Sequence, residues 1–182
     1  VAGAMWTPED GYLDPSEIIQ HYVREAVDAG AAVETQTAVT DVTVEDGRVT
    51  GVETETGTQS AAAVVNAAGP WAPTVNEMAG VSLPFRHNRG PVVVLQKDEP
   101  FRLPFVQFSD GLYFRSEGRN QAFAGNFGAS YADATRLSPS DARSVDHEFY
   151  LDVEDRIRER VPRLEGVELV NEWVGLRTLT PD

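Results

Sequence analysis

The chain has 182 residues, enough for one ordinary domain or two partial ones with a real core. It carries 15 basic and 29 acidic residues, and the resulting formal charge of −14 makes nucleic acid an unfavourable partner. The absence of cysteine excludes disulfides, thiol nucleophiles and cysteine metal sites. No apolar run approaches the roughly 18 residues of a membrane helix, and no targeting segment is visible, so we expect a cytoplasmic protein without a membrane span.

The acidic residues are spread along the chain, and Lys97 is the only lysine. This pattern is typical of proteins from salt-loving organisms, in which high salt screens the repulsion between surface carboxylates. We therefore expect a halophilic protein that is folded rather than disordered.

The first half of the chain predicts a helix, a β-meander and a second short helix. Asp14 can cap a helix whose first position suits Pro15, and Gly30 would end it. Its apolar positions recur at helical spacing: Ile18, Ile19, Tyr22, Val23, Ala26 and Val27. Residues 32–65 predict the meander, with a hairpin at Asp46-Gly47. Residues 61–69 are small and apolar, which favours a strand buried on both faces, and a helix to about Ala79 follows.

From residue 81 on, prolines separate a series of predicted strands, at residues 92–96, 105–108, 112–115 and 122–126. A second long helix is predicted from Ser138. Its apolar residues Val145, Phe149, Val153 and Ile157 recur every four positions, and Pro162 lies beyond its end. A final strand in residues 167–182 is interrupted by Gly175 and would carry Arg177 to its end. The expected fold class is α+β, with a boundary in composition near residues 80–81.

Few residues suggest chemistry directly. Arg177 has the planar fork that holds a carboxylate, although a strand-end arginine can equally pair with a neighbouring acid. Tyr113 could place a phenol in the same cavity or simply pack in the core. Gly69 would let a ligand approach the main chain closely, or would form a tightly packed turn. The histidines His21, His87 and His147 lack metal-ligand spacing, so we expect no metal site.

Six segments in the same order resemble one known family: DGYLDP (10–15), GAAV (30–33), TAV (37–39), GVET (51–54), VVNAAGPW (64–71) and WVGLRTLTPD (173–182). The series resembles the D-amino-acid-oxidase-type FAD-dependent oxidoreductase superfamily, in particular its branch of glycine and sarcosine oxidases and sarcosine and dimethylglycine dehydrogenases. The resemblance covers most of the chain and is weaker between about Lys97 and Arg163.

The resemblance implies two interleaved domains. Residues 14–80 would form part of an FAD-binding domain, with the helix, the β-meander and the buried strand. Residues 1–13 and 81–176 would form a substrate-binding domain, built on a large mixed or antiparallel sheet flanked by helices. Residues 177–182 would return to the FAD-binding domain.

The resemblance also implies roles for individual residues. Arg177 matches the arginine that grips the substrate carboxylate, and Tyr113 looks like the tyrosine that approaches the substrate. Val39 matches a position whose main chain meets the FAD adenine, and Gly69, with Trp71 beside it, lies near the nucleotide. The implied activity is oxidation of the C–N bond of a small amino acid or N-methyl amino acid by hydride transfer to FAD.

Two family segments are missing from the 182 residues: the glycine-rich dinucleotide fingerprint and a second flavin-contacting segment. We therefore expect this chain alone to be inactive and to lack tightly bound FAD, in contrast to the full-length protein. The same fold could instead oxidise a 2-hydroxy acid or glycerol phosphate, or serve as a non-catalytic binding or assembly module. The expected partner is a small carboxylate-bearing amine, and homo-oligomer formation stays open.

Overall fold

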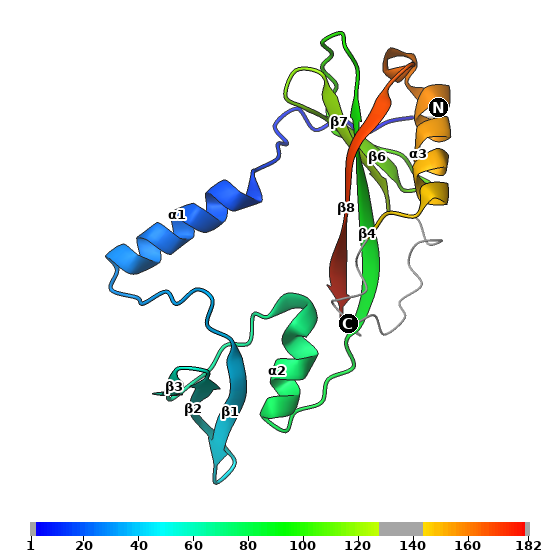
Figure 1. Ribbon diagram of the computed structural model, residues 1–182. Helices are drawn as coiled ribbons and strands as arrows, with labels where there is room; N and C mark the ends of the chain where they lie inside the picture. The colour runs from blue at the N-terminus through cyan, green and yellow to red at the C-terminus, as the bar shows by residue number, and fades with distance from the viewer. Residues whose placement is uncertain (1–2, 128–143, 181–182) are drawn as a thin grey trace.

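The computed structural model describes residues 3–127 and 144–180. Two antiparallel sheets and three α-helices make up the described part of the chain, which confirms the predicted α+β class (Figure 1). The helices are α1 (Pro15–Asp28), α2 (Ala72–Met78) and α3 (His147–Arg160). Short 3-10 turns precede α2 at Gly69–Trp71 and follow α3 at Pro162–Leu164.

The larger sheet has five antiparallel strands in the order β5-β6-β7-β4-β8. Their bounds are β4 (Arg86–Gln96), β5 (Val106–Gln107), β6 (Leu112–Glu117), β7 (Gln121–Asn126) and β8 (Glu168–Leu179). The four strands predicted between residues 92 and 126 are thus present, and β4 begins six residues earlier than expected. Its long ladder with β8 pairs Arg86 with Leu179 at one end and Gln96 with Glu168 at the other.

One face of this sheet packs against α3 and forms the core (Figure 1). The sheet contributes the buried side chains Val93, Leu95, Leu112, Phe114 and Ala124. The helix contributes Phe149, Val153 and Ile157, each at most 1% exposed, which confirms the predicted four-residue period. The predicted start of this helix at Ser138 lies outside the described residues. Because strand side chains alternate between faces, the intervening residues of β4, β6 and β7 lie on the opposite face.

The smaller sheet is the predicted meander, with β1 (Val39–Glu45), β2 (Arg48–Thr54) and β3 (Gly57–Ser60) in that order. The turn between β1 and β2 places Asp46 at φ 49° and Gly47 at φ 75°. Positive φ at both central residues matches the twist of a two-residue hairpin, which is why Asp-Gly is favoured there. Helix α2 contacts β1.

The buried strand predicted for residues 61–69 is not present. Residues 61–68 form no strand, and Val65 is 90% exposed. A strand can be buried on both faces only where neighbouring strands and covering layers surround it, and no described residue supplies them here. Instead the Asn66 side chain holds a loop, donating to the Ala72 carbonyl at 2.9 Å and to Asn76 Oδ1 at 2.8 Å.

The predicted interruption of the last strand at Gly175 is also wrong. Strand β8 continues to Leu179, so Arg177 lies within the strand rather than after it. Gly175 pairs with Gly90 of β4, and the ladder bonds continue because they use main-chain groups only. The consequence is a pair of facing glycines beside Arg177.

Candidate functional site

The sheet face opposite α3 carries both predicted substrate residues. Tyr113 pairs with Gly125 across β6 and β7, and Gly125 pairs with Val92 of β4. On the far strand, Arg177 pairs with Asn88 of β4. Since these positions alternate with the core residues of the same strands, Tyr113 and Arg177 lie on the same face.

A third residue, the aromatic Phe127, brings Tyr113 and Arg177 together. The rings of Tyr113 and Phe127 are stacked, with centroids 4.3 Å apart and an interplanar angle of 21°. The guanidinium carbon of Arg177 lies 4.5 Å from the centroid of the same Phe127 ring. Both distances are those of favourable aromatic and cation–π contacts. The structure therefore places the phenol and the guanidinium on one aromatic platform.

Two glycines leave the room that these side chains occupy. A Cβ added at Gly90 would stand 3.0 Å from Arg177 Nε, and one added at Gly125 would stand 2.6 Å from Tyr113 Cζ. Such distances are too short for ordinary packing, so a larger residue at either position would displace its neighbour. Gly90 and Gly125 thus let the two polar side chains lie flat against the sheet.

The charges of this face favour an anionic ligand. Arg177 forms no hydrogen bond or ion pair with any described residue, and the residue is partly exposed. Burial raises the pKa of the Tyr113 hydroxyl, an effect that the positive charges of Arg177 and Arg115 oppose. The phenol is therefore protonated at neutral pH and able to donate a hydrogen bond. A fixed guanidinium beside a neutral donor can hold a carboxylate.

The predicted cofactor residues form a second group, remote in sequence from the first. A hollow of about 410 Å³ lies between the small sheet and α2, and its lining includes Val39, Trp71, Ala68 and Met78. Gly69 directly follows Ala68 at φ 53°. A Cβ at Gly69 would meet nothing within 4 Å, so its main-chain conformation, rather than close packing, is what requires glycine there. The structure thus brings Val39 and Trp71 together, with Gly69 beside them.

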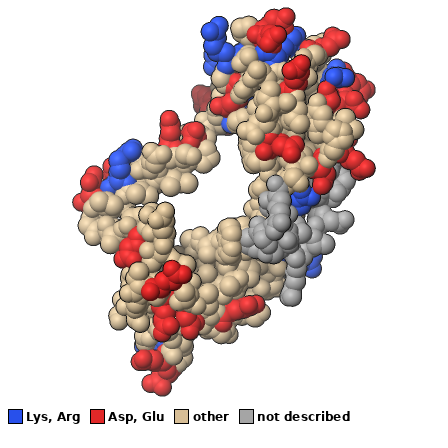
Figure 2. Space-filling model, viewed as in Figure 1, with Lys and Arg blue, Asp and Glu red and all other residues tan. Residues whose placement is uncertain are grey.

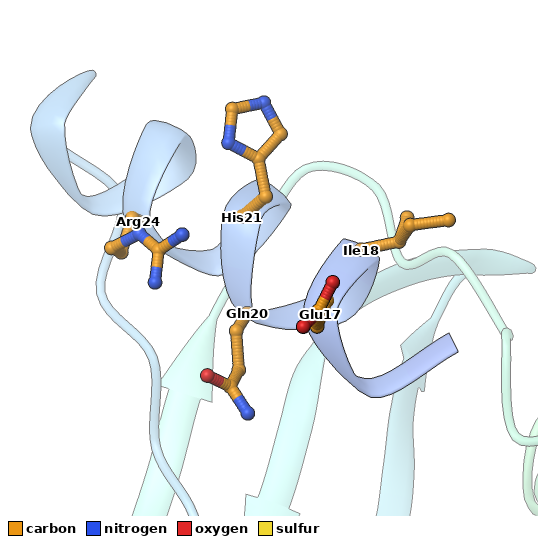
Figure 3. Close-up of a pocket in the computed structure, with 5 residues that line it drawn as sticks. All are labelled: Glu17, Ile18, Gln20, His21 and Arg24. Atoms are coloured by element: carbon orange, nitrogen blue, oxygen red, sulfur yellow. The ribbon is translucent and has the colours of Figure 1, made fainter. Parts of the chain in front are cut away.

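Another hollow, of about 520 Å³, lies along α1. Figure 3 shows that its five lining side chains, Glu17, Ile18, Gln20, His21 and Arg24, all come from this one helix and point in different directions. Side chains that diverge from a single helix do not converge on a ligand, so this hollow is not a binding site on its own.

The described residues contain no group of three or more potential metal ligands among His, Asp and Glu. His21 lies on α1, His87 on β4 and His147 at the start of α3. No helix in the described part of the chain is long and apolar enough to cross a bilayer.

Sequence reasoning missed three residues of the site: Phe127, Gly90 and Gly125. Phe127 immediately follows β7, in a segment that matches no known glycine-rich motif. No signal in the sequence pairs it with Arg177, because the contact depends on the register of strands about 50 residues apart. The same holds for Gly90 and Gly125, whose neighbours Arg177 and Tyr113 lie on other strands.

Comparison with known proteins identifies the family. The family described as DAO, FAD dependent oxidoreductase, matches residues 1–182. The sarcosine dehydrogenase of Mus musculus is 31% identical over 190 residues, covering 99% of this chain and 21% of that protein. The glycine oxidase of Geobacillus kaustophilus is 29% identical over 183 residues, covering 100% of this chain and 46% of that protein. Subunit A1 of the anaerobic glycerol-3-phosphate dehydrogenase of Haloferax volcanii is 37% identical over 101 residues, covering 47% of this chain and 17% of that protein.

A solved structure shares the fold of this chain. The L-proline dehydrogenase of P. horikoshii superposes with a TM-score of 0.82 at 26% identity, covering 97% of this chain and 47% of that chain. The chain thus spans less than half the length of these relatives. Because the family match extends over all 182 residues, the chain belongs to the DAO family of FAD-dependent oxidoreductases.

Proposed function

We propose that this chain is part of an enzyme that oxidises the C–N bond of a small amino acid or N-methyl amino acid. One observation carries the proposal: the Arg177 guanidinium, unpaired among the described residues, shares the Phe127 platform with the Tyr113 hydroxyl. Relatives named sarcosine dehydrogenase and glycine oxidase support the substrate class.

Arg177 and Tyr113 bind and orient the substrate. The guanidinium donates two parallel hydrogen bonds to the substrate carboxylate, and the neutral phenol donates a further hydrogen bond. When bound, FAD would supply the hydride acceptor for oxidation of the substrate C–N bond to an imine, which water would hydrolyse. Holding the donor carbon at a fixed position is the main contribution of the protein, since proximity removes much of the entropic barrier.

Val39, Gly69 and Trp71 would hold part of the FAD. The hollow between β1, β2 and α2 is lined mainly by apolar side chains, and Trp71 adds an aromatic surface, a lining that suits a flat ring system. The described residues contain no glycine-rich turn at a helix start that would bind the pyrophosphate. A flavin absorbance spectrum of the purified 182-residue chain tests the expectation that the chain alone lacks tightly bound FAD.

The proposed domain division follows the two sheets. Residues 14–80, with the small sheet, would belong to the FAD-binding domain, and residues 1–13 and 81–176 to the substrate-binding domain. A contact supports the assignment of residues 1–13 to the substrate-binding domain: Arg115 of the large sheet lies 4.1 Å from the centroid of the Tyr12 ring. Residues 177–182 would return to the FAD-binding domain, although β8 itself extends to Leu179.

A second candidate is oxidation of glycerol phosphate or a 2-hydroxy acid by the same fold. The relative named anaerobic glycerol-3-phosphate dehydrogenase favours it, since it is the most identical of the three over its shorter match. An arginine that binds a carboxylate can also bind a phosphate.

A substrate screen on the full-length protein separates the two candidates. Under anaerobic conditions, sarcosine, glycine and D-alanine are expected to bleach the flavin absorbance, and glycerol 3-phosphate and lactate are not. Bleaching by glycerol 3-phosphate or lactate alone would transfer the assignment to the second candidate. Bleaching by none of them would favour the non-catalytic module.

The acidic surface supports a halophilic protein. Figure 2 shows acidic groups scattered over the whole visible face, with fewer basic groups between them. With a net charge of −14, repulsion destabilises the folded chain at low salt. The melting temperature is therefore expected to rise with KCl concentration, and a flat or falling curve would contradict the proposal. Cytoplasmic location stays a prediction, which cell fractionation tests. Homo-oligomer formation also stays a prediction, which light scattering tests.

A further inference from the structure

The residue directly opposite Arg177 has an unusual environment. Asn88 pairs with Arg177 in the β4–β8 ladder, so their side chains are neighbours on the same face of the sheet. Asn88 is 8% exposed, and its buried Oδ1 has no hydrogen-bond partner among the described residues. A buried carbonyl oxygen without a donor destabilises a protein, and such atoms are rare in native structures.

The donor that could satisfy this oxygen lies beside it. A guanidinium has five N–H groups, of which a carboxylate uses two, and Arg177 donates none of them to a described residue. Arg177 now extends over Gly90, two positions from Asn88 on the same strand. Because directly opposite side chains have Cβ atoms about 5 Å apart, rotation about side-chain bonds is enough to join the two groups.

Resting on the proposed function, we propose that Asn88 is a positioning residue for Arg177. When the substrate carboxylate occupies two N–H groups of the guanidinium, the Asn88 carbonyl oxygen accepts a hydrogen bond from a third. This contact fixes the plane of the guanidinium fork, and through it the orientation of the substrate carboxylate. Asn88 does not itself touch the substrate.

The neighbouring residue on β4 supplies a matched control. His87 is 6% exposed, and its buried Nδ1 likewise has no partner in the part of the chain that the structure describes. It pairs with Thr178 and faces away from Arg177, toward the side of the sheet that α3 covers. His87→Leu and Asn88→Leu thus remove comparable polar groups from opposite faces of the same strand.

The test uses the full-length protein and two measurements of carboxylate binding: KM for the oxidised amino acid, and Kd for acetate from its effect on the flavin spectrum. Asn88→Leu is expected to raise KM and the acetate Kd about tenfold, because it removes one hydrogen bond to a charged group. The turnover number should change little, and His87→Leu should alter neither constant. In an Arg177→Lys background, Asn88→Leu should have no further effect, because the fork that it orients is gone.

Two results would overturn the assignment of Asn88 while leaving the proposed function intact. One is an Asn88→Leu variant with unchanged KM and acetate Kd while Arg177→Lys raises both. The other is an equal loss caused by Asn88→Leu with and without Arg177, which would make the residue merely structural. If Arg177→Lys itself changes neither constant, the proposed function fails together with the role of Asn88.

Discussion

The two halves of the molecule differ in how they bury their apolar side chains. Residues 81–127 and 144–180 form a sheet and a helix with a shared core, and of the buried apolar residues in the described chain only Val42 comes from outside this half. Residues 14–80 form equally regular elements, yet α1 has no buried residue and Tyr22 on it is 67% exposed. Local signals such as a cap and an apolar period therefore define where a helix lies, whereas a core requires elements that meet.

The largest expected effect tests this contrast directly. Phe149→Ala removes a side chain that is 1% exposed, and should lower the free energy of unfolding by about 3–5 kcal/mol. The control, Tyr22→Ala on the apolar stripe of α1, should change it by less than about 0.5 kcal/mol in the 182-residue chain. Urea titrations of both variants give the comparison. Similar losses in the two variants would mean that α1 is covered after all.

Arg177→Lys tests whether the half with the core also holds the substrate. Lysine keeps the positive charge but loses the planar fork, so KM for the amino acid should rise about 10- to 100-fold in the full-length enzyme. The melting temperature should change little, because Arg177 forms no hydrogen bond or ion pair with a described residue and lysine keeps the positive charge that faces the Phe127 ring. Steady-state kinetics give the first value and calorimetry the second. An unchanged kcat/KM would remove Arg177 from the site.

Strands β7 and β8, which lie on either side of β4, offer a matched pair of glycine substitutions. A Cβ at Gly125 would collide with the Tyr113 ring, whereas one at Gly175 would meet nothing within 4 Å. Gly125→Ala should therefore cost about 1–3 kcal/mol and alter the near-ultraviolet circular dichroism of the tyrosine. Gly175→Ala should stay within about 0.5 kcal/mol of the parent protein. Equal effects would mean that Tyr113 does not lie over Gly125.

The smallest effect concerns a surface cluster near the end of α3. Asp110 accepts from Arg156 at 2.7 Å and from Arg160 at 2.6 Å, and these contacts hold its pKa well below the ordinary value. A carboxyl group whose pKa is lowered on folding stabilises the folded state at pH values above its ordinary pKa of about 4. This stabilisation is lost as the pH falls below about 4 and the carboxylate becomes protonated. Asp110→Asn should thus lower the melting temperature slightly at pH 7. The difference from the parent protein should shrink progressively below pH 4.

Much of the fold follows from local sequence. Asp14 accepts from the main-chain N–H groups of Ser16 at 2.8 Å and Glu17 at 3.2 Å, as expected of a helix cap. The hairpin at Asp46-Gly47 follows from its turn chemistry, and the four-residue period places Phe149 on the buried face of α3. In each case the determining residues lie within a few positions of one another.

The site depended on contacts that no local pattern contains. The chemistry of Arg177 and Tyr113 makes them candidates and the family resemblance implies their roles, but the contact of both with Phe127 follows from strand register. Gly175 looked like the end of a strand because its partner, Gly90, lies 85 residues away in sequence. The prediction of a buried strand at residues 61–69 was wrong for the opposite reason. Their composition suits a buried strand, but burial is a property of the neighbours.

The contact between Tyr12 and Arg115 has a mechanical consequence. It fastens the chain to the large sheet just before α1 begins, and the chain returns to that sheet at Arg86 (Figure 1). Between these two points, the 3-10 turn Gly69–Trp71 also contacts β8. A movement that separates the small sheet from the large one would therefore have to break this contact too, whereas α1, which has no buried residue, has no such restraint of its own.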